Sequence, residues 1–158
     1  MNSCSFNGGA YHIKITTNPS SGYCIAYNSL FSNLAFQVQL TFFQGDAGGL
    51  IFRYINNGNL GCYLFEITRL GEYTLYSVKG NDASLLADGY SHVMNTGYYQ
   101  HNVLTVVAVG SHLYLYVNKL SVASVTNSNY VSGQVALFAG SNTGSTDVAF
   151  NNAQVWAL

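Results

Sequence analysis

Residues 34–43 read LAFQVQLTFF, the stretch of this chain in which the pattern of side chains is easiest to interpret. Every second position is apolar, at Phe36, Val38, Leu40 and Phe42, while Gln or Thr fills the positions between them. Apolar side chains at a period of two predict a β-strand that buries one face and exposes the other. The fold therefore has to provide a sheet with a core on one side.

Similar runs, rich in β-branched and aromatic residues, recur along the chain between turn signals that come about every 8 to 14 residues. The loop NNGN at residues 56–59 is a strong hairpin connector because Asn and Gly tolerate positive φ, and NPSSG at 18–22 also predicts a turn. The other predicted strands are residues 10–16, 23–27, 49–55, 62–68, 72–79, 103–109, 113–117, 122–126, 132–139 and 147–156, with short edge pieces at 84–86 and 92–94. About a dozen strands predict an all-β fold of two stacked antiparallel sheets, a β-sandwich.

Composition agrees with this fold class and excludes several others. The chain has 158 residues, of which 7% are charged, and its formal net charge is -1. We expect one domain over residues 1–158, since a chain of this length can form a single hydrophobic core.

The near-neutral charge argues against nucleic acid as a partner. No apolar run approaches the ~20 residues that span a bilayer, and the polar start has no signal peptide, so we expect a fragment of a longer protein with no membrane contact of its own.

Three segments resemble a known family. They are residues 45–76 (GDAGGLIFRYINNGNLGCYLFEITRLGEYTLY), residues 101–140 (HNVLTVVAVGSHLYLYVNKLSVASVTNSNYVSGQVALFAG) and residues 147–156 (DVAFNNAQVW). Together they resemble the concanavalin A-like jelly-roll domains, in particular laminin-G-like modules, levan-binding-type carbohydrate-binding modules and keto-disaccharide hydrolase-related domains. A similar arrangement occurs in the extracytoplasmic regions of some bacterial membrane serine/threonine kinases.

The resemblance implies a jelly-roll sandwich and, for function, a non-catalytic carbohydrate-binding or ligand-sensing module of a bacterial protein, outside the cell or on its surface. Its ligand would be a carbohydrate or a small polar molecule. Because this fold carries many functions, two alternatives stay open. One is a protein-interaction or adhesion domain with a protein partner, and the other, which we favour least, is a glycoside-processing enzyme.

Arg53 and Glu66 are the most informative charged residues, since each lies in an otherwise apolar predicted strand and the two strands are joined by the 56–59 turn. If the hairpin register pairs position 53 with position 62 or 64, both side chains share a face, whereas a slip of one residue separates them. On one face they could bind sugar hydroxyls through charge-assisted hydrogen bonds. The alternative is a structural cross-strand ion pair.

Aromatic residues supply further candidates. Tyr76 lies in a predicted strand and Tyr98 in a predicted loop. Either could stack on a sugar ring and hydrogen-bond through its hydroxyl, although core packing is the commoner role for a strand tyrosine. We therefore expect a ligand site made of Arg53 and Glu66, with Tyr76 and Tyr98 as weaker candidates.

Catalytic and metal-binding patterns are scarce. A glycosidase needs two carboxylates on one face, but the only glutamates, Glu66 and Glu72, lie on different predicted strands, so we expect no enzyme. Asp46, Asp82, Asp88 and Asp147 lie in or near predicted turns, but their spacing matches no calcium loop. The sequence predicts no cofactor, and only the resemblance leaves a calcium ion open.

The three cysteines are Cys4, Cys24 and Cys62. A Cys4–Cys24 disulfide would pin the N-terminal segment to the sandwich and would suit a protein outside the cytoplasm. Cys62 lies inside a predicted strand, where we expect a buried free thiol. The alternative is three reduced thiols in a cytosolic chain.

Overall fold

The computed structural model describes all residues except 1, 17–19 and 143, and the described residues form β-strands joined by turns and loops. The strands are β1 (Asn2–Asn7), β2 (Ala10–Ile15), β3 (Ser20–Ile25), β4 (Leu34–Gln44), β5 (Ala47–Asn56), β6 (Leu60–Thr68), β7 (Glu72–Lys79), β8 (Asp82–Tyr90), β9 (His101–Val109), β10 (His112–Val117), β11 (Leu120–Thr126), β12 (Gln134–Ser141) and β13 (Thr146–Ala157). In this part of the chain no helix is long and apolar enough to cross a membrane.

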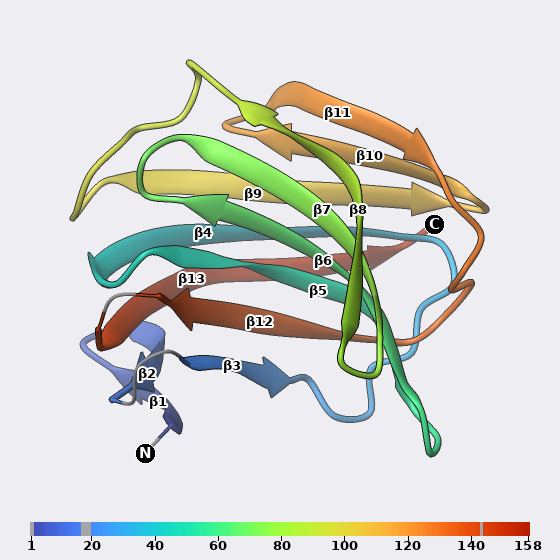
Figure 1. The fold of residues 1–158 in the computed structure, drawn as a ribbon, viewed down its shortest axis with the longest axis horizontal. Helices are drawn as coiled ribbons and strands as arrows, with labels where there is room; N and C mark the ends of the chain where they lie inside the picture. Colours follow the sequence, from blue (N-terminus) through green and yellow to red (C-terminus); the bar gives the residue numbers. More distant parts are fainter. Residues whose placement is uncertain (1, 17–19, 143) are drawn as a thin grey trace.

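These strands form two antiparallel sheets that lie face to face (Figure 1). One sheet has seven strands in the order β1-β2-β13-β4-β9-β10-β11, and the other has six in the order β3-β12-β5-β6-β7-β8. Strands far apart in sequence are neighbours in both sheets, as where β13 lies between β2 and β4. The predicted all-β, two-sheet antiparallel sandwich is therefore confirmed.

The core lies between the sheets and follows the period-two pattern of the sequence. In β4 the alternate residues Phe36, Val38, Leu40 and Phe42 are all buried in it. The six-stranded sheet contributes the inward-facing residues of its own strands, such as Phe65 of β6. Burying one apolar face of each sheet against the other removes both from water, which is the main force that holds a sandwich together.

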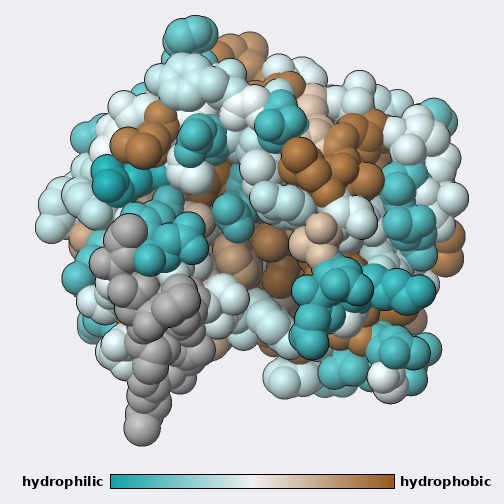
Figure 2. Space-filling view, viewed as in Figure 1, coloured by the Kyte–Doolittle hydropathy of each residue, from teal (hydrophilic) through white to brown (hydrophobic). Residues whose placement is uncertain are grey.

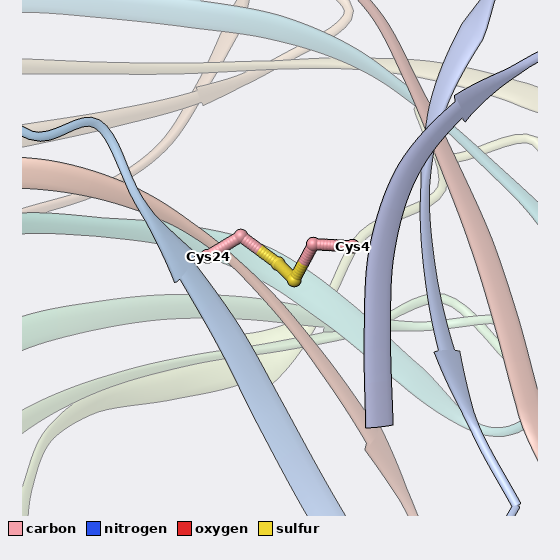
Figure 3. Close-up of a disulfide and its surroundings, with 2 residues drawn as sticks. All are labelled: Cys4 and Cys24. Carbon is pink, nitrogen blue, oxygen red and sulfur yellow. A yellow bond between two sulfur atoms is a disulfide. The ribbon is translucent and has the colours of Figure 1, made fainter. Parts of the chain in front are cut away.

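The N-terminal strands are tied to the opposite sheet by a disulfide between Cys4 of β1 and Cys24 of β3 (Figure 3). The two Cα atoms are 6.4 Å apart, within the range that a disulfide spans. Cys62 is a buried free thiol. The disulfide thus joins an edge strand of the seven-stranded sheet to an edge strand of the six-stranded one.

Several predicted boundaries were wrong. Strand β1 was not predicted, because its sequence NSCSFN is polar and has no apolar alternation. The edge piece at 84–86 is the middle of the longer strand β8, and residues 92–94 lie in a loop rather than a strand. The predicted turn at 18–22 falls partly outside the described residues, and its described part belongs to β3.

Candidate functional site

The outer face of the six-stranded sheet, which points away from the core, has an apolar centre instead of a uniformly polar surface. Ile51, Tyr54, Cys62 and Ala136 are buried there, and half-buried apolar residues, among them Phe138, pack against them. Figure 2 looks onto this side of the molecule and shows a hollow near its middle, with hydrophobic residues on the floor and hydrophilic residues around it. A sheet face of this kind is suited to binding a ligand, which would cover its apolar centre.

One cavity on this face brings together two of the residues that the sequence singled out. We call it the Glu66 pocket; it has a volume of about 390 Å³ and is lined by Ser21, Ala47, Glu66, Tyr76, Phe138, Gly140, Ser141 and Asn142. The cavity exists because the residues at its centre have small side chains. Gly140 lies opposite Ala47 in the β12–β5 register, so no large side chain fills the space beside Phe138.

The Glu66 carboxylate has no hydrogen-bond or ion-pair partner among the described residues. Burial alone accounts for its electrostatics: removal from water raises the pKa of Glu66 to about 7. On the adjacent strand Thr74 lies directly opposite Glu66, and its Oγ1 atom is also buried without a partner. Two neighbouring polar groups on this face therefore lack partners in the part of the chain that the structure describes.

Aromatic rings flank this carboxylate on two strands. Tyr76 of β7 pairs with Leu64, which is two residues from Glu66 on the same face of β6. Phe138 of β12 lies on the other side, beyond β5. Both rings are half-buried. The pocket therefore combines an acceptor for hydroxyl groups with aromatic surfaces and neutral polar side chains.

The structure corrects the expectation that Arg53 shares this site. A β-bulge between Phe52 and Ile55 shifts the β5–β6 register, and Arg53 itself adopts a positive φ of 52°. Its side chain is 1% exposed, so a surface ligand cannot reach it. It does not form the alternative ion pair with Glu66 either.

Arg53 instead donates hydrogen bonds to three backbone carbonyl groups at one end of the sandwich. Its Nε and Nη2 atoms donate to the Ser32 carbonyl oxygen at 2.9 and 2.7 Å. Its Nη1 atom donates to the carbonyl oxygens of Gly110 at 2.8 Å and Tyr130 at 3.0 Å. The guanidinium therefore satisfies backbone acceptors that three different loops bring together, which is a structural role.

Tyr98 does not line the Glu66 pocket. It is 41% exposed in the loop between β8 and β9, and the Arg69 guanidinium lies 5.0 Å from the centre of its ring. This geometry is a cation–π contact. Of the four predicted ligand residues, the structure thus brings only Glu66 and Tyr76 together.

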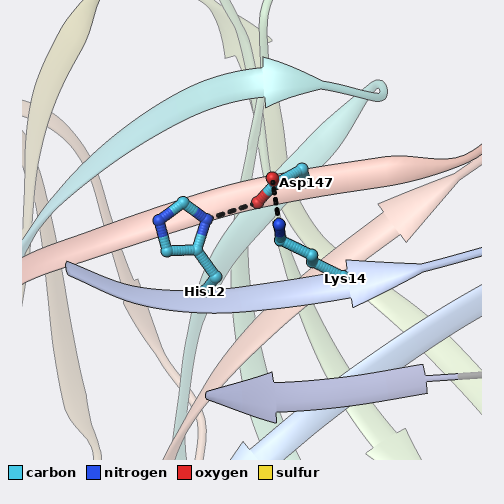
Figure 4. A network of polar contacts seen from close by, with 3 residues as sticks. All are labelled: His12, Lys14 and Asp147. Carbon is cyan, nitrogen blue, oxygen red and sulfur yellow. Dashed lines mark hydrogen bonds and ion pairs between the residues drawn. The ribbon is translucent and has the colours of Figure 1, made fainter. Parts of the chain in front are cut away.

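The acidic residues considered for calcium do not gather. Asp147 of β13 contacts two side chains on β2: His12 Nδ1 at 2.6 Å and Lys14 Nζ at 3.2 Å (Figure 4). Asp46 accepts a hydrogen bond from the Asn142 backbone at 2.9 Å. Over residues 2–16, 20–142 and 144–158, no group of three or more His, Cys, Asp or Glu side chains could hold a metal ion.

Sequence reasoning did not identify Phe138, Gly140 or the polar residues beside them. A signal was present in the run VALFAG at residues 135–140, which is apolar or small at every position. A strand that is apolar on both faces has its outer face covered by something other than water. That pattern could have indicated a ligand-covered face, although it could not have identified Glu66 as its neighbour.

No protein-family model matches this sequence, and no curated protein matches it. Solved structures do match its fold. A carbohydrate-binding module, CBM66 from Bacillus subtilis, has a TM-score of 0.84 at 15% identity, over 99% of this chain and 92% of that one. The VIP36 exoplasmic/lumenal domain in its Ca²⁺/Man-bound form gives 0.73 at 9% identity, over 99% and 81%. An endo-β-galactosidase from Clostridium perfringens gives 0.69 at 10% identity, over 98% and 54%. At these identities the likeness establishes the fold, a jelly-roll β-sandwich.

Proposed function

We propose that this chain is a non-catalytic carbohydrate-binding module that holds a sugar in the Glu66 pocket. The observation that carries the proposal is the unpartnered Glu66 carboxylate between Tyr76 and Phe138 in a hollow of the sheet. A carboxylate accepts hydrogen bonds from adjacent hydroxyl groups, and aromatic rings pack against the C–H face of a sugar. Three of the solved structures with this fold are a carbohydrate-binding module, an endo-β-galactosidase and a Man-bound lumenal domain, which supports the same ligand class.

The setting of the module is part of the proposal. A disulfide such as Cys4–Cys24 persists in oxidising compartments and is rare in the cytosol. This favours a domain displayed outside the cell or on its surface. The proposal includes a ligand-sensing role in that setting.

Binding is tested by calorimetry and a glycan array with the wild-type chain and matched variants. Glu66→Gln and Tyr76→Ala should each weaken sugar binding at least tenfold, the loss expected when a charged hydrogen-bond partner or a stacking surface is removed. Glu72→Gln is the control, because Glu72 is the other glutamate and lies exposed on β7 beside Thr68. Equal affinities for the wild type and Glu66→Gln would reject the Glu66 pocket as the site.

The competing function is that of a glycosidase, which a second carboxylate on the same face favours. Asp88 of β8 faces the same side as Glu66, with Thr74 of β7 between them, so the two Cα atoms are about 10 Å apart at the usual strand spacing. Asp88 is exposed and does not line the Glu66 pocket. Incubating the bound glycan with wild-type protein and assaying new reducing ends separates the two functions. Release of product that Glu66→Gln and Asp88→Asn both abolish would establish an enzyme.

A further inference from the structure

A second cavity opens on the same sheet face, toward the other end of strands β3, β12 and β5. We call it the tyrosine pocket: it has a volume of about 710 Å³, and its lining includes Tyr11, Tyr23, Tyr27, Tyr54, Asn56 and Gln134. The Cys4–Cys24 disulfide closes one side of it. None of the described residues that line it carries a charge, so its chemistry suits a neutral ligand.

The two tyrosines at its centre form a preorganised pair. The Tyr23 and Tyr54 rings are 5.6 Å apart, and their hydroxyl oxygens lie 3.4 Å from one another. The hydrogen bond to Tyr54, helped by partial burial, raises the pKa of Tyr23 to about 12. The Tyr23 hydroxyl therefore stays neutral at physiological pH, where it can donate to and accept from the hydroxyl groups of a sugar.

The tyrosine pocket and the Glu66 pocket are neighbours on this sheet face. Tyr23, in the first, lies directly opposite Phe138, in the second, in the β3–β12 register. Ser21 also lines the Glu66 pocket and is two residues from Tyr23 on the same face of β3, about 7 Å along the strand. One cross-strand pair is thus all that divides the two cavities.

The combined groove is longer than a single sugar ring. Gly140 lines the Glu66 pocket and Gln134 lines the tyrosine pocket, and both belong to β12. Six residues of extended strand separate them, which corresponds to about 20 Å. Between the two ends the floor is apolar, formed by residues such as Ile51 and Ala136.

We infer that the ligand is a linear, uncharged oligosaccharide, with one unit in the Glu66 pocket and further units extending along β12 into the tyrosine pocket. This inference rests on the proposed function and adds to it the length of the ligand and a second subsite. Tyr23 and Tyr54 bind the sugar units that extend into the tyrosine pocket. The Glu66 pocket binds one unit whatever the chain length.

The test uses calorimetry with mannose, galactose, glucose and fructose, each as the monosaccharide and as linear oligomers of two to five units. For the series that binds, the wild-type affinity should rise about tenfold or more from one unit to the longer oligomers, as expected for added aromatic and hydrogen-bonding contacts. Tyr23→Ala should remove this gain while it leaves the monosaccharide affinity unchanged. Glu66→Gln should weaken binding at every length.

Two further variants serve as a second test and a control. Tyr27→Ala changes a residue that is 79% exposed, so it should fold normally and should reduce the gain with chain length. Tyr114→Ala is the matched control, because Tyr114 is an exposed tyrosine on β10 of the other sheet, and it should keep the full gain.

Different failures have different meanings. If the wild type binds a monosaccharide and its pentamer equally well, the groove is rejected while the Glu66 pocket stands. The same conclusion follows if Tyr23→Ala and Tyr27→Ala both keep the gain with length. If no sugar in any series binds, the proposed function is rejected, and the second subsite with it.

Discussion

Gly49 lies directly opposite Glu66 in the antiparallel register of β5 and β6, and a Cβ atom at Gly49 would clash with the Phe65 carbonyl oxygen. The strand next to the unpartnered carboxylate therefore approaches β6 more closely than a side chain would allow. This contact fixes the β6 backbone on which Glu66 stands. The shape of the Glu66 pocket depends on a residue that has no side chain.

Gly49→Ala tests this dependence. The added methyl group has to push β5 and β6 apart at Glu66, which should reduce the free energy of unfolding by about 1–3 kcal/mol and weaken sugar binding. Denaturant unfolding and calorimetry measure the two effects. Gly58→Ala is a comparison for backbone strain without a steric clash, because a Cβ there meets open space but its φ of 99° disfavours any residue except glycine. If Gly49→Ala changes neither quantity, the close approach is unimportant.

Glu66 should make the stability of the fold depend on pH. Its pKa is about 7 in the folded chain against 4.5 for an ordinary glutamate, so between these values the folded state holds a proton that the unfolded state has released. The free energy of unfolding should fall as pH rises from about 4.5 and level off above 7. The difference between the two pKa values limits this loss to about 3 kcal/mol.

Glu66→Gln should remove this dependence, since Gln resembles the protonated carboxyl at every pH. The variant should equal the wild type near pH 4 and exceed it in stability at pH 8. Thermal unfolding across this range, with Glu72→Gln alongside, measures the effect. Parallel stability curves for the wild type and Glu66→Gln would show that Glu66 titrates normally.

Sugar affinity should show the opposite trend with pH. The ionised carboxylate accepts stronger hydrogen bonds from hydroxyl groups than the neutral acid does. Wild-type affinity should therefore increase as pH rises through about 7, the pKa of Glu66. Affinity of Glu66→Gln should be flat over the same range. Titration calorimetry between pH 5.5 and 8.5 distinguishes the two, and a flat wild-type profile contradicts a role for the charged form.

Arg53 should matter for stability and not for ligand binding. Arg53→Met keeps much of the apolar stem but leaves the carbonyl oxygens of Ser32, Gly110 and Tyr130 without their donor. Hydrogen bonds to a charged donor contribute about 1.5–3 kcal/mol each, so the loss should exceed about 3 kcal/mol. In a domain of this size the Tm should fall by roughly 6–12 °C.

Arg69→Met is the comparison for Arg53, because it removes a cation–π contact with Tyr98 and should cost about 1 kcal/mol or less. Sugar affinity of the Arg53→Met protein, measured well below its Tm, should equal that of the wild type. If Arg53→Met lost sugar affinity without losing stability, Arg53 would have to be part of the binding site.

The disulfide should stabilise the fold and shape only one part of the groove. Replacing Cys4 and Cys24 with Ser opens a link between positions 20 residues apart, which should cost about 3 kcal/mol. Because the disulfide lines the tyrosine pocket and not the Glu66 pocket, affinity for oligomers should fall more than affinity for the monosaccharide. Thiol titration of the unfolded wild type should give one thiol without reductant. Three would show that the link is absent.

Much of the fold could be predicted from local patterns. The alternation in β4 and the NNGN connector between β5 and β6 identified strands and a hairpin because burial and turn geometry act over a few residues. Strand β1 escaped prediction since it is a polar edge strand held by pairing with β2 and by the Cys4 disulfide. Such support comes from distant residues and leaves no periodic signal in the segment itself.

Local patterns in the sequence were enough to predict a two-sheet sandwich, since period-two burial and turn chemistry are local consequences of side-chain type. The sequence also singled out Glu66 as a charged residue in an apolar strand. That Glu66 faces a pocket with Phe138 while Arg53 points into the interior became evident only from the folded chain. The cause is the strand register. One bulge at Arg53 reverses the side of the sheet on which its side chain lies, and that shift depends on loops that meet only in the folded chain.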